Sequence, residues 1–124
     1  MKNKVERHLK SHKKHGKPVL FLLIDSENFK TSKDVEKMAK GIMKACKKMT
    51  AAPAILVGGS SATDQIEMNN VVKIIKKITR LDTILFPGNI TGVVPKADAI
   101  LFSSLMNSEN PYYITQAQAL GAPL

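Results

Sequence analysis

Four apolar runs interrupt the polar segments of this chain. They cover residues 19–24, 54–57, 83–86 and 97–102. A continuous apolar run of this length, bounded by polar or turn-forming residues, is typical of a strand that is covered on both faces, as in a parallel sheet. We therefore expect four strands at these positions.

Two segments between these runs have an apolar residue every three or four positions, which predicts amphipathic helices. We expect Thr31 or Ser32 to cap the first helix, with Asp34 in its first turn, and Ser61 or Thr63 to cap the second. The apolar face of the first helix comprises Val35, Met38, Ala39, Ile42, Met43, Cys46 and Met49. The face of the second comprises Met68, Val71, Val72, Ile75 and Ile78.

The two ends of the chain are expected to form short helices. Val5 and Leu9 are four positions apart in the polar, lysine-rich segment 1–17, so one helix is expected there. Near the other end, Asn110-Pro111 is typical of a helix start, and we expect a helix near residues 111–120 with Gly121 as its stop.

No helical periodicity separates the third strand from the fourth. Residues 87–96 contain two glycines and two prolines, so we expect a loop or at most one helical turn. Elsewhere strands and helices alternate, which implies right-handed βα units on a parallel sheet. Four such strands are half of an eight-stranded barrel, which needs roughly 200 residues or more. The expected fold class is thus α/β with a parallel sheet, about half the size of an eight-stranded barrel.

The net positive charge of the chain limits the classes of partner that we expect. The net charge is +9, the basic residues concentrate in residues 2–48, and after Arg80 only Lys96 is positive. A basic segment can meet nucleic acid, an anionic membrane or a phosphorylated substrate, although a solvated lysine face is the simplest interpretation. Because the sequence has no arginine cluster and no interleaved aromatics, we expect no nucleic acid partner, while membrane-surface contact stays open.

Cysteine content and hydropathy indicate the compartment. Cys46 is the only cysteine, which fits a reducing environment. The N-terminus lacks the apolar core of a signal peptide, and no apolar run approaches the ~20 residues of a membrane span. We expect a soluble, cytoplasmic protein. His8, His12 and His15 lie among lysines, and we expect no metal site there.

The ends of the first three strands have the residues best suited to bind a ligand. Asp25 ends the first strand, Gly58-Gly59-Ser60-Ser61 follows the second, and Pro87-Gly88-Asn89 follows the third. Parallel α/β proteins bind ligands at the C-terminal ends of their strands. Glycines let backbone N–H groups approach an anion, and hydroxyls bind oxygens or a hard cation. These loops predict a phosphate or diphosphate ligand with Mg²⁺.

The ordered motifs resemble those of the geranylgeranylglyceryl phosphate synthases, the prenyltransferases of archaeal ether-lipid synthesis, and of their bacterial relatives. The resemblance covers nearly everything from residue 19 onward. The matching stretches are Leu23-Ile24-Asp25, Val57-Gly58-Gly59-Ser60, Leu85-Phe86-Pro87-Gly88-Asn89, Ala97-Asp98-Ala99-Ile100-Leu101-Phe102, Ser104-Leu105-Met106-Asn107-Ser108, Asn110-Pro111-Tyr112-Tyr113-Ile114 and Gln116-Ala117-Gln118-Ala119-Leu120-Gly121-Ala122-Pro123.

The resemblance implies a fold and a reaction. The fold is a modified TIM (β/α)8 barrel in which a loop replaces the helix after the third strand, and this chain corresponds to its N-terminal half with about four parallel strands. The chain then divides into a basic N-terminal helix or extension, residues 1–17, and a partial barrel domain, residues 18–124. The reaction is Mg²⁺-dependent transfer of a geranylgeranyl group from its diphosphate to the 3-hydroxyl of sn-glycerol 1-phosphate.

The resemblance also implies which residues form the site. Asp25 and Ser60 correspond to metal-binding positions, and no catalytic residue is assigned. The substrate-binding positions on the diphosphate and prenyl side are Gly58, Gly59, Ser61, Gly88 and Asn89.

Each position also has a purely structural interpretation. Asp25 could cap the turn that follows it, and Ser60 could cap the next helix, in which case Ser61 is the alternative ligand. Gly88 and Asn89 could simply shape a tight loop.

The sequence lacks the glycine-rich Tyr-x-Glu-Ala-Gly-Ser-Gly stretch with which the family builds its glycerol-phosphate pocket. If the polypeptide ends at Leu124, we expect an open sheet edge and unburied helix faces. We then expect marginal stability for the chain alone, or assembly with a C-terminal half or an oligomer partner. Two other functions remain open. One is another phosphate-binding barrel enzyme, such as a sugar-phosphate isomerase; the other is an inactive half-barrel that binds anionic lipid or RNA.

Overall fold

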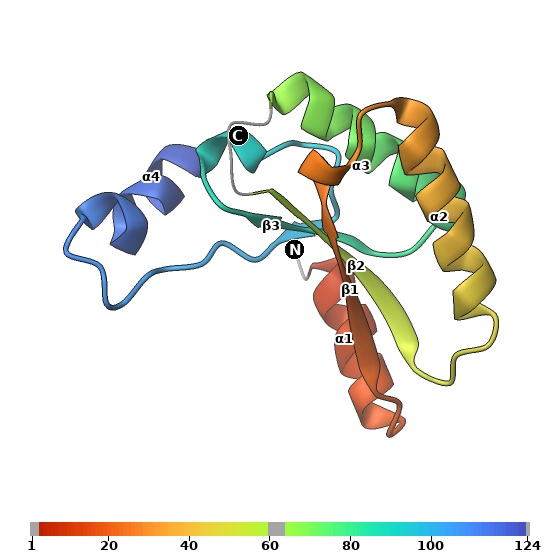
Figure 1. Cartoon of the computed structure of the whole chain (residues 1–124). Coiled ribbons are helices and arrows are strands. Elements are labelled where there is room, and N and C mark those ends of the chain that lie inside the picture. Colours follow the sequence, from red (N-terminus) through yellow and green to blue (C-terminus); the bar gives the residue numbers. More distant parts are fainter. Residues whose placement is uncertain (1–2, 60–63, 124) are drawn as a thin grey trace.

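The computed structural model describes residues 3–59 and 64–123. Within them, four parallel strands form one sheet in the order β1-β2-β3-β4 (Figure 1). The strands are β1 (Val19–Asp25), β2 (Ala52–Gly59), β3 (Thr83–Pro87) and β4 (Ala99–Ile100). The predicted α/β class with a four-stranded parallel sheet is confirmed.

The fourth strand is shorter than the predicted run of residues 97–102. Ala99 and Ile100 pair with β3, and the Leu101 N–H still donates to the carbonyl of Leu85 at 2.8 Å. The next hydrogen bond of a parallel ladder would need an N–H group at Pro87, and proline has none. The pairing of β4 therefore stops where β3 reaches its proline.

Helices α2 (Ser32–Cys46) and α3 (Gln65–Thr79) pack beside one another on one face of the sheet (Figure 1). Helix α2 begins with the predicted cap, because the side chains of Thr31 and Asp34 each accept a hydrogen bond from the other residue's backbone N–H. The core beneath the two helices is built from Val35, Ile55, Val57, Met68, Val72 and Ile75.

Two helix ends differ from the prediction. The N-cap of α3 is Asp64, whose side chain accepts from the Ile66 N–H at 3.1 Å, whereas the predicted caps Ser61 and Thr63 lie outside the described residues. The helix therefore begins at Gln65, and a carboxylate is a good acceptor for its first N–H groups. Helix α2 ends at Cys46, so Met49 lies beyond the helix and is 36% exposed instead of joining the apolar face.

Helix α1 (Lys4–Lys14) lies on the opposite face of the sheet from α2 and α3 (Figure 1). The helix predicted from Val5 and Leu9 is confirmed, and Val5 is buried against Ala54 and Ile84. The imidazole of His8 is hydrogen bonded to the buried carboxylate of Asp82, which precedes β3. We call the side of the sheet that α1 contacts the inner face.

The segment between β3 and β4 contains a single turn of 3₁₀-helix, η2 (Ile90–Gly92), and no α-helix. The prediction of a loop in place of a helix is confirmed. The Asn89 side chain caps this turn by accepting from the Thr91 N–H at 2.9 Å and from the Thr91 hydroxyl. Val94, which follows this turn, is buried in the core beneath α2 and α3.

The last helix occupies the predicted region in two parts, a π-helical segment η3 (Tyr112–Gln116) and helix α4 (Ala117–Gly121). The Asn110 side chain accepts from the Tyr112 N–H, as expected for a helix start. The prediction for Gly121 was wrong, because its φ is not positive and it is the last residue of α4. A Cβ there would lie 3.0 Å from Phe102, so close packing explains this glycine. No helix in the described ranges is long and apolar enough to cross a membrane.

Candidate functional site

The register of the sheet aligns the ends of its first three strands. Asp25 of β1 pairs with Gly58 of β2, and Gly58 pairs with Phe86 of β3. Side chains alternate between the faces of a strand. Since Ile24, Val57 and Leu85 contribute to the core beneath α2 and α3, their neighbours Asp25, Gly58 and Phe86 lie on the inner face.

A hollow of about 260 Å³ lies on the inner face at these strand ends. Its lining includes four of the residues that the sequence singles out: Asp25, Gly58, Gly59 and Gly88. The remaining lining residues are Leu23, Phe86, Pro87 and Ser103. The structure therefore brings one carboxylate and three glycines from three different strand ends to one open, partly apolar surface.

Asp25 takes part in local structure and also faces the hollow. Its Oδ1 atom accepts from the Glu27 N–H at 3.0 Å and so caps the 3₁₀ turn η1 (Ser26–Asn28). The capping role that the sequence left open is therefore real. The side chain is nevertheless exposed and borders the hollow, so a carboxylate oxygen can still reach a ligand there.

Glycines allow the ends of β2 and β3 to approach each other closely. A Cβ on Gly58 would lie 2.8 Å from the carbonyl oxygen of Phe86, a distance that no side chain can occupy without moving the strands. The Gly88 N–H donates to the carbonyl of Gly59 at 3.3 Å, which ties the loop after β3 to the end of β2. Close strand packing alone thus requires glycine at position 58.

Of the other predicted site residues, the structure places only Asn89, and it lies outside this group. Asn89 is absent from the lining of the hollow, and its side chain is engaged in capping η2, as the structural interpretation of this loop expected. Ser60 and Ser61 lie outside the described residues. Their proposed contacts with metal and diphosphate stay predictions.

Sequence reasoning missed Ser103 and the apolar walls formed by Leu23 and Phe86. Ser103 directly follows Phe102, at the C-terminal end of the fourth apolar run. The rule that selected the first three strand ends would have selected this hydroxyl as well. The two apolar residues have no sequence signal of their own, because they follow the ordinary alternation of buried strands.

The donor set of the hollow can be compared with the requirements of Mg²⁺. In the described part of the chain no group of three or more histidine, cysteine, aspartate or glutamate side chains forms a metal cage. Mg²⁺ does not need one, since it keeps several waters and is held by one or two carboxylates together with phosphate oxygens. Asp25 supplies one such carboxylate beside glycines that leave room for a diphosphate. The residues present fit a Mg²⁺ ion shared with a diphosphate ligand.

Comparison with known proteins identifies close relatives. Residues 13–123 match the PcrB family. The chain is 63% identical to the geranylgeranylglyceryl phosphate synthase of Nitrosopumilus maritimus (strain SCM1) over 98% of this chain and 46% of that protein. It is 60% identical to the synthase of Cenarchaeum symbiosum (strain A), over 96% of this chain and 46% of that protein.

A solved structure shows the same fold. The crystal structure of (S)-3-O-geranylgeranylglyceryl phosphate synthase from Thermoplasma acidophilum, in complex with its substrate sn-glycerol-1-phosphate, aligns with a TM-score of 0.76 at 32% identity. The alignment covers 99% of this chain and 47% of that one. The chain therefore spans about half the length of the relatives that it matches.

Proposed function

The chain belongs to the PcrB family, and we propose that it provides the prenyl-diphosphate side of the active site of a geranylgeranylglyceryl phosphate synthase. The observation that carries this proposal is the meeting of Asp25, Gly58, Gly59 and Gly88 around one hollow at the strand ends. The names of the most similar relatives supply the reaction class, alkyl transfer to a glycerol phosphate.

In the proposed reaction, the 3-hydroxyl oxygen of sn-glycerol 1-phosphate attacks C1 of geranylgeranyl diphosphate. A carbon–oxygen ether bond forms, the bond from C1 to the diphosphate oxygen breaks, diphosphate leaves with the bonding electrons, and the hydroxyl loses its proton. The main task of the protein on this side is to bind the diphosphate as its charge grows. No described side chain is assigned as the base.

Each residue of the hollow has a defined part in this proposal. The Asp25 carboxylate would hold Mg²⁺, with Ser60 as the second predicted ligand. Bound Mg²⁺ supplies Lewis-acid neutralisation of the leaving diphosphate. Gly58 and Gly59 would leave the backbone open to diphosphate oxygens, and Leu23 and Phe86 give the hollow an apolar wall.

The acceptor side of the site is proposed to lie in a second half of the barrel. The relatives are about twice as long as this chain, and the Thermoplasma acidophilum structure contains sn-glycerol-1-phosphate. We propose that a C-terminal half or an oligomer partner supplies the glycerol-phosphate pocket. The cytoplasm is the proposed compartment, in keeping with a single cysteine and no disulfide within the chain.

Isothermal titration calorimetry of the chain with geranylgeranyl diphosphate, with and without Mg²⁺, tests the proposal. We expect binding that requires Mg²⁺. A folded chain that binds no diphosphate under either condition would contradict the proposal and would favour the inactive half-barrel. The sugar-phosphate isomerase alternative loses its support, because the family match covers residues 13–123.

A further inference from the structure

The net charge of the chain is unevenly distributed. Residues 1–48 contain 14 of the 19 basic residues and five of the ten acidic ones, so this segment accounts for the whole net charge of +9. Within it, α1 and α2 lie on opposite faces of the sheet. The basic residues of these two helices therefore form separate surfaces.

Helix α2 concentrates its lysines in one line. Lys33, Lys37, Lys40 and Lys44 follow each other at spacings of four, three and four residues, and all four are exposed. This spacing places them on one side of the helix over roughly 16 Å, at 1.5 Å per residue. We call these four residues the α2 lysine row. The opposite side of the helix, with Val35 and Ala39, is buried in the core.

Acidic neighbours leave most of this charge uncompensated. Among the described residues, the α2 lysine row has one ion pair, between Lys40 and Glu36 at 3.9 Å, and both side chains are well exposed. An exposed pair at that distance contributes little. Lys76 of α3 behaves differently, because its ammonium donates to Asp98 at 2.7 Å and to the Lys96 carbonyl at 2.8 Å. Lys76 holds the fold together, whereas the α2 lysine row faces solvent.

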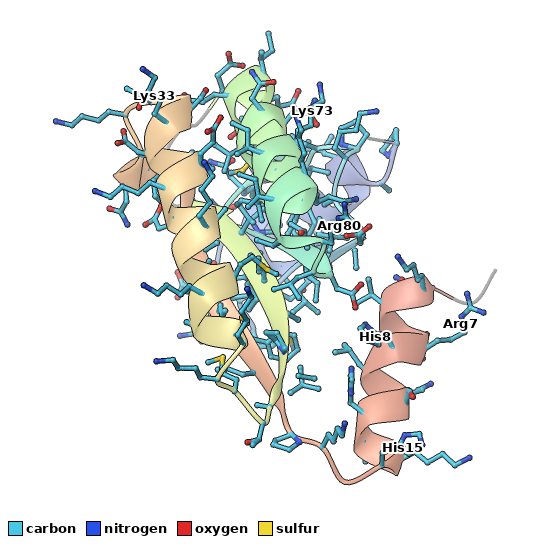
Figure 2. The ribbon with its side chains drawn as sticks, turned by 90° about the vertical axis from the view of Figure 1, so that its right-hand side faces the viewer. Arg7, His8, His15, Lys33, Lys73 and Arg80 are labelled. Carbon is cyan, nitrogen blue, oxygen red and sulfur yellow. The ribbon has the colours of Figure 1, made fainter. Side chains whose placement is uncertain are left out.

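Helix α3 extends the basic surface beside α2. Figure 2 shows Lys33 on α2 and Lys73 on α3, and these two helices pack against each other. Lys73 and Lys77 are exposed and lie one helical turn apart. Two adjacent helices thus present lysines over a broad outer layer, while the inner face with its hollow stays on the other side.

We propose that the α2 lysine row, with Lys73 and Lys77 beside it, docks the protein onto an anionic lipid surface. The choice of a lipid rests on the proposed function, because a substrate with a C20 prenyl tail partitions into membranes. The composition also favours a diffuse anionic surface over RNA. Only two of the 19 basic residues are arginine and aromatics make up 5% of the chain, so the donors and stacking platforms that nucleic acid recognition uses are scarce.

Co-sedimentation of the chain with vesicles of 30% phosphatidylglycerol in phosphatidylcholine tests the proposal. The test variant replaces the α2 lysine row with glutamine. Its matched control replaces Lys4, Lys10, Lys13 and Lys14 of α1 with glutamine, which gives the same net charge but alters the opposite side of the sheet. One lysine near an anionic surface contributes about fivefold to binding, so we expect the test variant to bind at least about 30-fold more weakly and the control to lose less than about threefold.

The outcomes separate this proposal from the proposed function. Equal losses in both variants, or no preference for anionic over pure phosphatidylcholine vesicles, would overturn lipid docking by the α2 lysine row. Binding of a single-stranded RNA by this row in place of vesicles would also overturn it. Both variants should retain Mg²⁺-dependent diphosphate binding. Vesicle binding that depends on the row in a chain that binds no diphosphate would support the docking surface and contradict the proposed function.

Discussion

Asp25 combines two roles that one substitution can separate. Replacing it with asparagine keeps an Oδ1 acceptor for the Glu27 N–H but removes the charge that a metal ion requires. Changes outside the ligand shell already weaken metal sites about 10- to 100-fold, so we expect the Mg²⁺-dependent affinity for geranylgeranyl diphosphate to fall at least about tenfold in Asp25→Asn, measured by calorimetry.

Asp64→Asn is the matched control for this substitution. Asp64 is also an exposed aspartate that caps a helix, but it does not border the hollow. Its replacement should leave diphosphate affinity unchanged. Undiminished binding by Asp25→Asn, or an equal loss in both variants, would contradict the assignment of Asp25 as a ligand.

Gly58 shows how packing and ligand access require the same residue. In Gly58→Ala the new methyl group would meet the Phe86 carbonyl at 2.8 Å, so β2 and β3 must separate. We expect a loss of about 1–3 kcal/mol in the free energy of unfolding, measured with urea. Gly41→Ala in α2, where nothing lies within 4 Å, should instead stabilise by about 0.5–1 kcal/mol. An unaffected Gly58→Ala variant would show that the two strands yield easily.

At the scale of elements, the contact between α1 and the sheet depends on a polar pair. Asp82 is 7% exposed and is hydrogen bonded to His8 in the middle of α1, whereas His15 is the C-cap of this helix (Figure 2). His8→Ala would leave the buried carboxylate without this partner, and we expect a loss of about 1–3 kcal/mol in stability. His15→Ala should change stability by less than about 0.5 kcal/mol in the same urea titration, because His15 is exposed. Equal losses of stability in His8→Ala and His15→Ala would contradict a stabilising role for the contact between His8 and Asp82.

The elements themselves were largely predictable because their signals are local. Apolar periodicity located α2 and α3, and the Thr31–Asp34 pair located the start of α2. The errors arose where a distant partner decides the outcome. Pro87 limits how far β4 pairs, and Phe102 rather than a left-handed turn explains Gly121. The contact of Asp82 with His8, 74 positions away, also has no local signal.

At the scale of the molecule, the sheet has a covered outer face and a partly open inner face. Phe21, Leu23, Phe86 and Leu101 are each more than 40% exposed. Exposed apolar surface of this kind is typical of an interaction surface.

Marginal stability of the chain alone, or assembly with another half, stays a prediction. A soluble monomer that unfolds cooperatively would contradict it. The division of the chain into an N-terminal extension, residues 1–17, and a partial barrel domain, residues 18–124, also stays a prediction.

The central claim is that the strand ends of this half-barrel bind a prenyl diphosphate through Mg²⁺. Two-dimensional ¹H–¹⁵N NMR of the chain, titrated with geranylgeranyl diphosphate with and without Mg²⁺, tests it most directly. The account predicts that the amide signals of Gly58, Gly59 and Gly88 shift only when both are present, while those of α2 do not. Shifts confined to other surfaces, or none at the three glycines, would contradict it.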